Sequence, residues 1–218
     1  MGKFFGGKSM DSQLFVRHHR VPEPAALIEW YDREVRRGPT YFAYRPTTPS
    51  DTLLLEDLGL AVLLEGRPQS RAAMSLALLD DEQRDLRAVP KTALHLSTPD
   101  DRQAILQAIV DLVSLPGFAS SLATKVLHKK RPATVPILDN RAIYGTLLSD
   151  TWIPGKKPTS NSVRRGQTIA LALETIYTIV SAPKNEPAFV ELEKRFPDLT
   201  RIQLFDKVWW AFIRPKDS

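Results

Sequence analysis

Residues 115–139 read LPGFASSLATKVLHKKRPATVPILD, and this stretch determines how the rest of the chain is interpreted. Its first residues, Leu-Pro-Gly, suit a tight turn, because glycine adopts backbone conformations that other residues resist. Before the turn, Thr98 caps a helix whose apolar residues recur on one face as far as about Ser114. After the turn, a second helix is expected over 119–129. The sequence therefore predicts two helices joined by a hairpin over about residues 103–129.

The rest of the chain also carries residues that are typical of helix starts and ends. Pro24 and Gly38 bracket one expected helix, and the leucine-rich stretch 51–65 is apolar on nearly all sides, which predicts a central buried helix. Strand-like alternation is weak and is confined to 41–44. Further helices are expected over 140–148, 163–181, 185–195 and 200–213. We therefore expect an all-α fold: a flexible tail over residues 1–10 and a single helical domain over 11–218.

Composition excludes several classes of protein. The chain of 218 residues contains no cysteine, so disulfides, thiolate metal sites and a cysteine nucleophile are excluded. No uninterrupted apolar run reaches the roughly 18 to 20 residues that a membrane-spanning helix needs, and the first ten residues do not resemble a secretory signal. From this we expect a cytoplasmic protein that does not associate with a membrane and that has no metal site and no cofactor.

The charge balance favours a polyanionic partner without requiring one. There are 30 Lys and Arg against 25 Asp and Glu, which gives a net charge of +5 and an isoelectric point of about 9.5. The basic residues gather locally in four places. These clusters are 17–20, 125–131, 156–157 and 164–165.

The quoted stretch resembles the hairpin segment of the helix-hairpin-helix DNA glycosylase superfamily, in which Leu-Pro-Gly opens a hairpin and an essential aspartate follows. Counting Leu115 as the first position, Asp139 is the twenty-fifth, which is the spacing of the endonuclease III-like members. The resemblance implies a two-lobed all-α fold with the aspartate in a cleft. The part HKKRPATVPILD also resembles an uncharacterised bacterial family.

The resemblance also implies a division of labour on double-stranded DNA. Hairpin amides and nearby cations would hold the phosphodiester backbone, while Asp139 acts as the catalytic carboxylate on a flipped-out nucleotide. The product would be an abasic site, as in base excision repair, and a bacterial chain of this kind would be associated with the nucleoid. The DNA-contacting residues implied in this way are Leu115, Pro116, Gly117, Phe118, Ala119, Ser121, Lys125, Lys129, Lys130 and Arg131.

Three departures from the family pattern bear on the mechanism. Bifunctional members carry a lysine nucleophile at the seventh position, where this chain has Ser121. This predicts a monofunctional enzyme that hydrolyses the N-glycosidic bond, unless Lys125, one helical turn later, replaces that lysine. The second hairpin glycine is replaced by Ala119, and Asn140 follows the aspartate where the family commonly has threonine.

Each of these features also has a simpler interpretation. Asp139 can cap a helix that begins at Asn140, and the cations of 129–131 suit a helix C-terminus whether or not a ligand binds. Trp152 is a further candidate for a nucleic-acid contact, whereas His18 is expected in a solvated tail. The alternative functions are a non-catalytic helix-hairpin-helix module that binds DNA and a helical protein-interaction protein. No pattern indicates which base is recognised or an oligomeric state.

Overall fold

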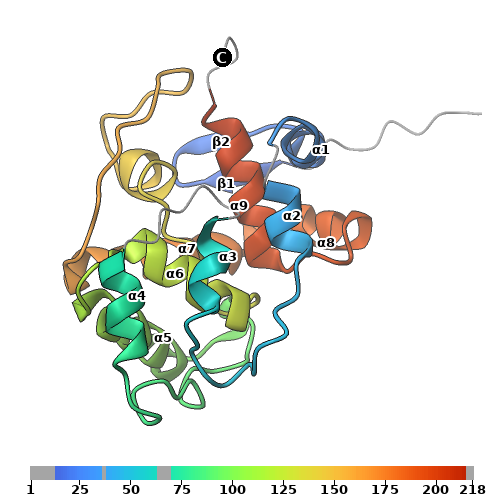
Figure 1. Cartoon of the computed structure of the whole chain (residues 1–218). Coiled ribbons are helices and arrows are strands. Elements are labelled where there is room, and N and C mark those ends of the chain that lie inside the picture. The colour runs from blue at the N-terminus through green and yellow to red at the C-terminus, as the bar shows by residue number, and fades with distance from the viewer. Residues whose placement is uncertain (1–12, 36–37, 63–69, 215–218) are drawn as a thin grey trace, which may run out of the picture.

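The computed structural model describes residues 13–35, 38–62 and 70–214 and is mostly helical (Figure 1). The expected tail over 1–10 lies outside these residues. No helix within them is long and apolar enough to cross a membrane. In chain order the elements are β1 (Leu14–Val16), β2 (His19–Val21), α1 (Pro24–Glu34), α2 (Gly38–Ala43), α3 (Asp57–Val62), α4 (Ser70–Ala77), η1 (Leu94–Leu96), α5 (Pro99–Ser114), α6 (Ser120–Lys130), η2 (Ile143–Leu147), α7 (Gly166–Val180), η3 (Pro183–Asn185), α8 (Glu186–Arg195) and α9 (Arg201–Phe212).

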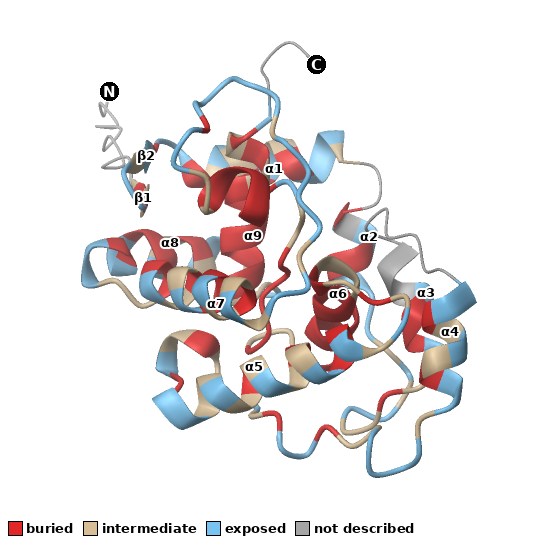
Figure 2. Cartoon of the chain, turned by 90° about the vertical axis from the view of Figure 1, so that its left-hand side faces the viewer, coloured by how far each residue is buried: buried red, intermediate tan, exposed pale blue. Residues whose placement is uncertain are grey.

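The elements pack in two groups that do not follow chain order. The N-terminal strands and α1 lie against the C-terminal α8 and α9, whereas α3 and α5 pack on α6, and α7 joins α5 to α9 (Figure 1). Helix α9 is buried along nearly its whole length and lies among the other helices (Figure 2). The last helix of the chain is therefore a central element of the core.

Two helices begin with the same capping arrangement. At α5, the Thr98 side chain accepts a hydrogen bond from the Asp101 N–H, and the Asp101 carboxylate accepts one from the Thr98 N–H. At α9, Thr200 and Gln203 form the same reciprocal pair. These bonds satisfy N–H groups that a helix start leaves without partners. Both starts follow from local sequence alone.

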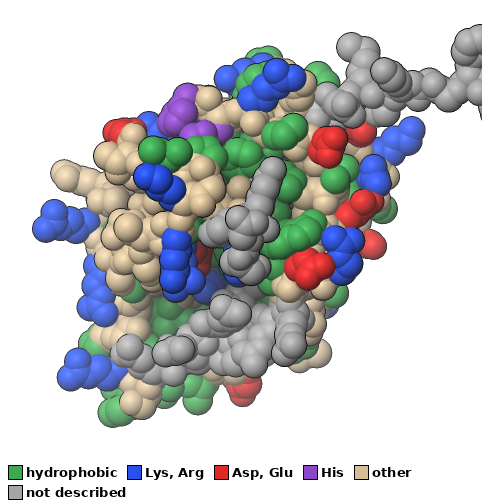
Figure 3. Space-filling view, turned by 90° about the horizontal axis from the view of Figure 1, so that it is seen from above, with side chains coloured by type: hydrophobic (Ala, Val, Ile, Leu, Met, Phe, Trp, Pro, Cys, Tyr) green, Lys and Arg blue, Asp and Glu red, His purple; other side chains and the backbone are tan. Residues whose placement is uncertain are grey.

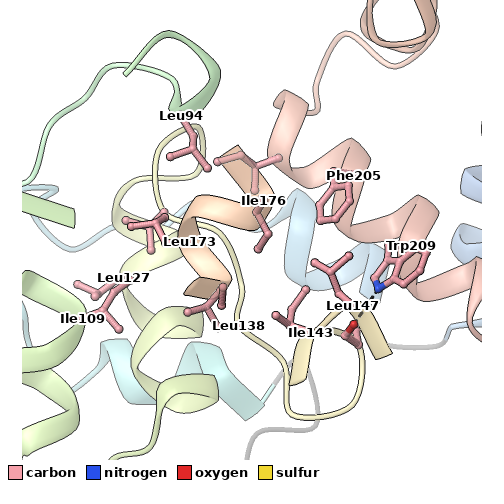
Figure 4. Close-up of a cluster of buried hydrophobic side chains, with 14 of the residues drawn as sticks. Leu94, Ile109, Leu127, Leu138, Ile143, Leu147, Leu173, Ile176, Phe205 and Trp209 are labelled. Atoms are coloured by element: carbon pink, nitrogen blue, oxygen red, sulfur yellow. Dashed lines mark hydrogen bonds between the residues drawn. The ribbon is translucent and has the colours of Figure 1, made fainter. Parts of the chain in front are cut away.

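The core lies where α9 meets the segment that follows α6. The indole Nε1 of Trp209 donates a hydrogen bond of 2.7 Å to the carbonyl of Ala142, at the start of the short π-helix η2. Apolar side chains from several elements extend from this contact across the core (Figure 4). They are Leu94, Ile109, Leu127, Leu138, Ile143, Leu147, Leu173, Ile176 and Phe205, each at most 3 % exposed.

The N-terminal region corrects two expectations. His18 lies at the turn of an antiparallel β-hairpin, β1–β2, and not in a solvated tail. The Asn185 side chain accepts from the Phe15 N–H and donates to the Phe15 carbonyl, at 2.8 Å in each case. This exchange satisfies backbone groups on the outer edge of β1. Residues 41–44, the only expected strand, instead lie in and after α2.

The stretch 51–65 is not one long helix. Thr52 forms an isolated β-bridge with Asp85, and the short helix α3 begins only at Asp57, whose carboxylate accepts a hydrogen bond of 2.8 Å from the Leu54 N–H. The part of this stretch from residue 63 lies outside the described residues. Long-range contacts therefore override the helical pattern here.

Helix α4, which the sequence did not predict, packs on the turn between α5 and α6. Gly117 has a φ of +91°, and a Cβ at this position would lie 2.4 Å from the backbone nitrogen of Ala72. The Ser75 hydroxyl donates a hydrogen bond of 2.9 Å to the Pro116 carbonyl. Glycine is thus required both by the backbone conformation and by the close approach of α4.

We predict that Gly117→Ala destabilises the protein more than Gly155→Ala. Gly155 has a similar φ of +85°, but a methyl group at this position would meet nothing within 4 Å, so it reports the conformational cost alone. That cost is about 1–3 kcal/mol, and Gly117→Ala adds the clash with α4. Urea unfolding of both variants measures the difference. Equal losses would show that α4 is not held against the turn.

Candidate functional site

Asp139 follows the buried Leu138 and caps the next helical segment. Its Oδ1 accepts hydrogen bonds from the N–H groups of Arg141 at 2.8 Å and Ala142 at 3.0 Å. The capping role is therefore present in the structure. The side chain remains 23 % exposed, so the carboxylate is partly accessible to solvent although backbone donors fix one of its oxygens.

Lys125 lies beside the second carboxylate oxygen. Its Nζ is 3.9 Å from Asp139 Oδ2, and its side chain is 9 % exposed. The Thr124 hydroxyl accepts a hydrogen bond of 2.9 Å from the Leu138 N–H, which ties the segment before the aspartate to α6. This tie brings together a lysine and a carboxylate that are separated by a helix turn and a loop.

A second carboxylate, Asp206, comes from α9 and was not predicted from the sequence. It is 7 % exposed. Burial, together with the negative charge of Asp139, raises its pKa to about 7 against the lowering effects of Lys125 and Lys207. The only sequence signal for it is an acid in a helix that is apolar on most sides. Asp139, Lys125 and Asp206 thus influence one another from three separate segments.

Two tyrosines flank this group of charges. The Tyr41 hydroxyl donates a hydrogen bond of 2.8 Å to the Lys125 carbonyl. Burial raises the pKa of Tyr41 and of Tyr31, and the charge of Asp206 adds to the increase in both. Both phenols therefore stay neutral at ordinary pH, and that of Tyr41 holds the backbone of α6 at Lys125.

The turn between α5 and α6 is partly covered. Phe118 is fully buried, α4 lies against Gly117, and the Ser120 N–H donates a hydrogen bond of 3.0 Å to the Val163 carbonyl. Leu115, Ala119 and Ser121 are partly exposed, and Pro116 is exposed. The turn thus offers fewer open backbone groups to a ligand than the sequence implied.

The cations at the end of α6 point inward, which corrects the expectation that they contact phosphate. Lys130 forms an ion pair of 2.9 Å with Asp57, in which each side chain is 1 % exposed. Lys129 donates to the carbonyls of Tyr41 and Tyr44, and burial, with Arg45 adding to the effect, lowers its pKa to about 8. These bonds hold the segment over 41–58 against α6.

Arg131 completes this inward-facing group. Its guanidinium donates to the carbonyls of Ser50 at 2.7 Å and Leu86 at 3.0 Å, and pairs with Asp51 at 2.6 Å. Trp152 is also in the core rather than on the surface, because it is 8 % exposed and its Nε1 donates to the Lys156 carbonyl at 3.0 Å. Neither side chain is placed to meet a nucleic acid.

One cavity among the described residues is not lined by Asp139. It has a volume of about 410 Å³ and is lined from α1, α2, α8 and α9, with Phe42, Arg45, Arg195 and Lys207 among its residues. Neither Asp139 nor Lys125 lines it. Within the part of the chain that the structure describes, no three His, Asp or Glu side chains are grouped as metal ligands.

Comparison with known proteins places most of this site in a family. A family model described as a family of unknown function (DUF6308) matches residues 25–175. The matched region contains Lys125 and Asp139 and ends within α7, so Asp206 lies outside it. No curated protein and no solved structure matches the chain.

We predict that Asp206→Asn changes how stability depends on pH. The pKa of Asp206 is raised from 3.8 to about 7, so between these values the folded state binds its proton more tightly than the unfolded chain does. The free energy of unfolding therefore falls as pH rises through this window. Asn cannot lose a proton, so the variant should gain stability relative to wild type, by roughly a few kcal/mol between about pH 5 and about pH 8.

Urea unfolding at several pH values tests this, with exposed Asp150→Asn as the matched control. His128 acts in the opposite direction, because burial lowers its pKa to about 4 and stability then rises with pH up to 6.5. His128 is the same in all three proteins, so it cancels in the comparison. A difference between Asp206→Asn and wild type that does not vary with pH would contradict the prediction.

We also predict that Lys130→Ala is strongly destabilising. The substitution leaves the Asp57 carboxylate buried without its cation, which typically costs about 3–5 kcal/mol. Arg33→Ala removes the exposed pair with Glu34 and should cost at most about 1 kcal/mol. Chemical unfolding measures both. Similar losses would mean that Lys130 is not a structural cation.

Proposed function

The chain belongs to the DUF6308 family, and we propose that it is a monofunctional DNA glycosylase-like hydrolase with Asp139 as its catalytic carboxylate. The observation that supports this most is the division of roles at Asp139. One carboxylate oxygen is fixed by two backbone N–H groups, and the other lies 3.9 Å from Lys125 Nζ at a partly exposed position. A carboxylate held in this way is oriented before a substrate arrives.

In this proposal α5 and α6 are taken as the two helices of the helix-hairpin-helix. The segment that leads to Asp139 is tied back to α6 by the hydrogen bond from the Leu138 N–H to the Thr124 hydroxyl. We take the two packed groups of elements as the two lobes that the resemblance implies. Asp139 then lies at the start of the helical segment that enters the second group.

The proposed chemistry uses water and the side chains of this chain. As the N-glycosidic bond breaks, its electron pair leaves with the base and positive charge develops on the sugar. The Asp139 carboxylate stabilises that charge and accepts the proton of the attacking water, whose oxygen bonds to the anomeric carbon. The departing base takes up a proton from solvent. Lys125 orients the carboxylate. We propose hydrolysis rather than a covalent lysine intermediate because Ser121 stands where bifunctional members carry the lysine nucleophile.

A second candidate is favoured by one observation. Because α4 contacts Gly117 and covers part of the turn, the hairpin can be a connector between helices in a protein that does not bind DNA. In that case Asp139 is only a helix cap. This candidate predicts no measurable affinity for duplex DNA even at low salt.

We predict that Asp139→Asn abolishes base release and leaves the fold intact. An asparagine side-chain oxygen still accepts the hydrogen bonds from Arg141 and Ala142, so the cap is kept while the charge is lost. Asp139→Ala removes both the cap and the charge, and it should also lower the free energy of unfolding by about 1 kcal/mol. Duplexes that carry uracil, 8-oxoguanine, alkylated adenine or mismatches are incubated with each protein, and alkali then reveals abasic sites.

Asp150→Asn, on an exposed side chain, is the matched control and should keep full activity. Base release by the Asp139→Asn variant at the wild-type rate would exclude Asp139 as the catalytic group. A covalent adduct trapped by borohydride on an abasic duplex would show that Lys125 or another amine attacks the sugar, and would overturn the monofunctional mechanism. No base release by wild type from any duplex would overturn the activity itself.

A further inference from the structure

Exposed cations lie in the part of the chain that follows Asp139. Lys156, Lys157, Arg164 and Arg165 are exposed, as is Arg141, two residues after the aspartate. No ion pair joins any of these five side chains to an acid among the described residues. The segment 151–173 contains no Asp or Glu. Their charges are therefore not neutralised within the described fold.

The segment that bears these cations is fixed to the candidate site. The Asn161 N–H donates a hydrogen bond of 3.1 Å to the Asn140 carbonyl, one residue from Asp139. The Thr159 carbonyl lies where a Cβ on Gly145 would be, at 1.9 Å, so the two backbones are in close contact. These contacts hold the middle of the segment along the chain that follows the aspartate.

The two ends of the segment are also attached. The buried Trp152 anchors one end through its hydrogen bond to the Lys156 carbonyl, and the Ser120 N–H anchors the other through the Val163 carbonyl. The cations between and beside these anchors point outward. Figure 3 shows Lys and Arg side chains along the flank of the molecule on which the 148–165 loop lies in Figure 1.

This surface contrasts with the end of α6. There the cations are used to hold the protein together, and Lys130 is 1 % exposed. Phosphate groups bind cations that are accessible and not already paired, and each such contact releases counterions from DNA. Of the two basic regions near Asp139, the segment 153–165 is the one that has these properties.

We propose that residues 153–165, together with Arg141, form the surface that contacts the phosphodiester backbone of duplex DNA. The inference rests on the proposed function, because it places a nucleotide at Asp139, and it moves the backbone contacts away from the hairpin and the end of α6. Arg164 and Arg165 directly precede α7, and Lys156 and Lys157 lie in the loop before them.

The test compares three double variants of the full chain on an undamaged, fluorescently labelled duplex. Lys156→Ser/Lys157→Ser and Arg164→Ser/Arg165→Ser each remove two charges from the surface. Lys184→Ser/Lys194→Ser removes two exposed charges beside and in α8 and is the matched control. Binding is followed by fluorescence anisotropy between about 50 mM and about 200 mM salt, where log K falls with log salt in proportion to the phosphate contacts.

Each surface variant should weaken binding roughly tenfold at the lower salt concentration and reduce the salt slope by about one to two. The control should bind like wild type, and all three should keep the wild-type unfolding temperature. Surface variants with wild-type affinity and slope would overturn this inference while leaving the glycosylase proposal standing. If the surface variants lose binding and the wild type releases no base, the result would support the DNA-contacting role of this surface and overturn the glycosylase proposal. No binding by wild type would overturn both.

Discussion

The ion pair between Lys130 and Asp57 is the interaction on which the surrounding structure depends. Both side chains are almost fully buried, and neither charge can remain there without the other. Lys129 and Arg131 extend this interaction to the carbonyls of Tyr44 and Ser50. The last turn of α6 thus organises a long irregular stretch with little regular secondary structure. The same inward orientation removes these cations from the protein surface.

The candidate site follows from that arrangement. Since α6 is fixed at its C-terminal end, Lys125 in its middle is directed toward the segment that ends at Asp139. The aspartate has one oxygen that caps the helix and one that backbone donors leave open, so the cap and the proposed chemistry would use different atoms of the same group. Asp206 adds a buried carboxylate behind the pair, where its protonation responds to the charge of Asp139. The two acids are therefore coupled, although they come from distant parts of the chain.

The features that could be predicted from the sequence are local ones. The start of α5 at Thr98, the turn at Gly117 and the capping role of Asp139 each depend on a few neighbouring residues. The features that were missed depend on partners far along the chain. The β1–β2 hairpin is held by Asn185, 170 residues from Phe15, and the basic cluster of α6 was interpreted by composition although its acids lie elsewhere. Composition cannot show which way a cation points.

The packing of the first elements against the last ones has a consequence for synthesis. The hairpin β1–β2 and α1 leave the ribosome well before α8 and α9, which pack against them. Until then the apolar side chains of Leu14, Val16 and Ile28, all fully buried in the finished protein, have no native partner. The middle of the chain can fold first. A nascent chain then carries an unfolded N-terminal segment with exposed apolar side chains, which chaperones are suited to protect from aggregation.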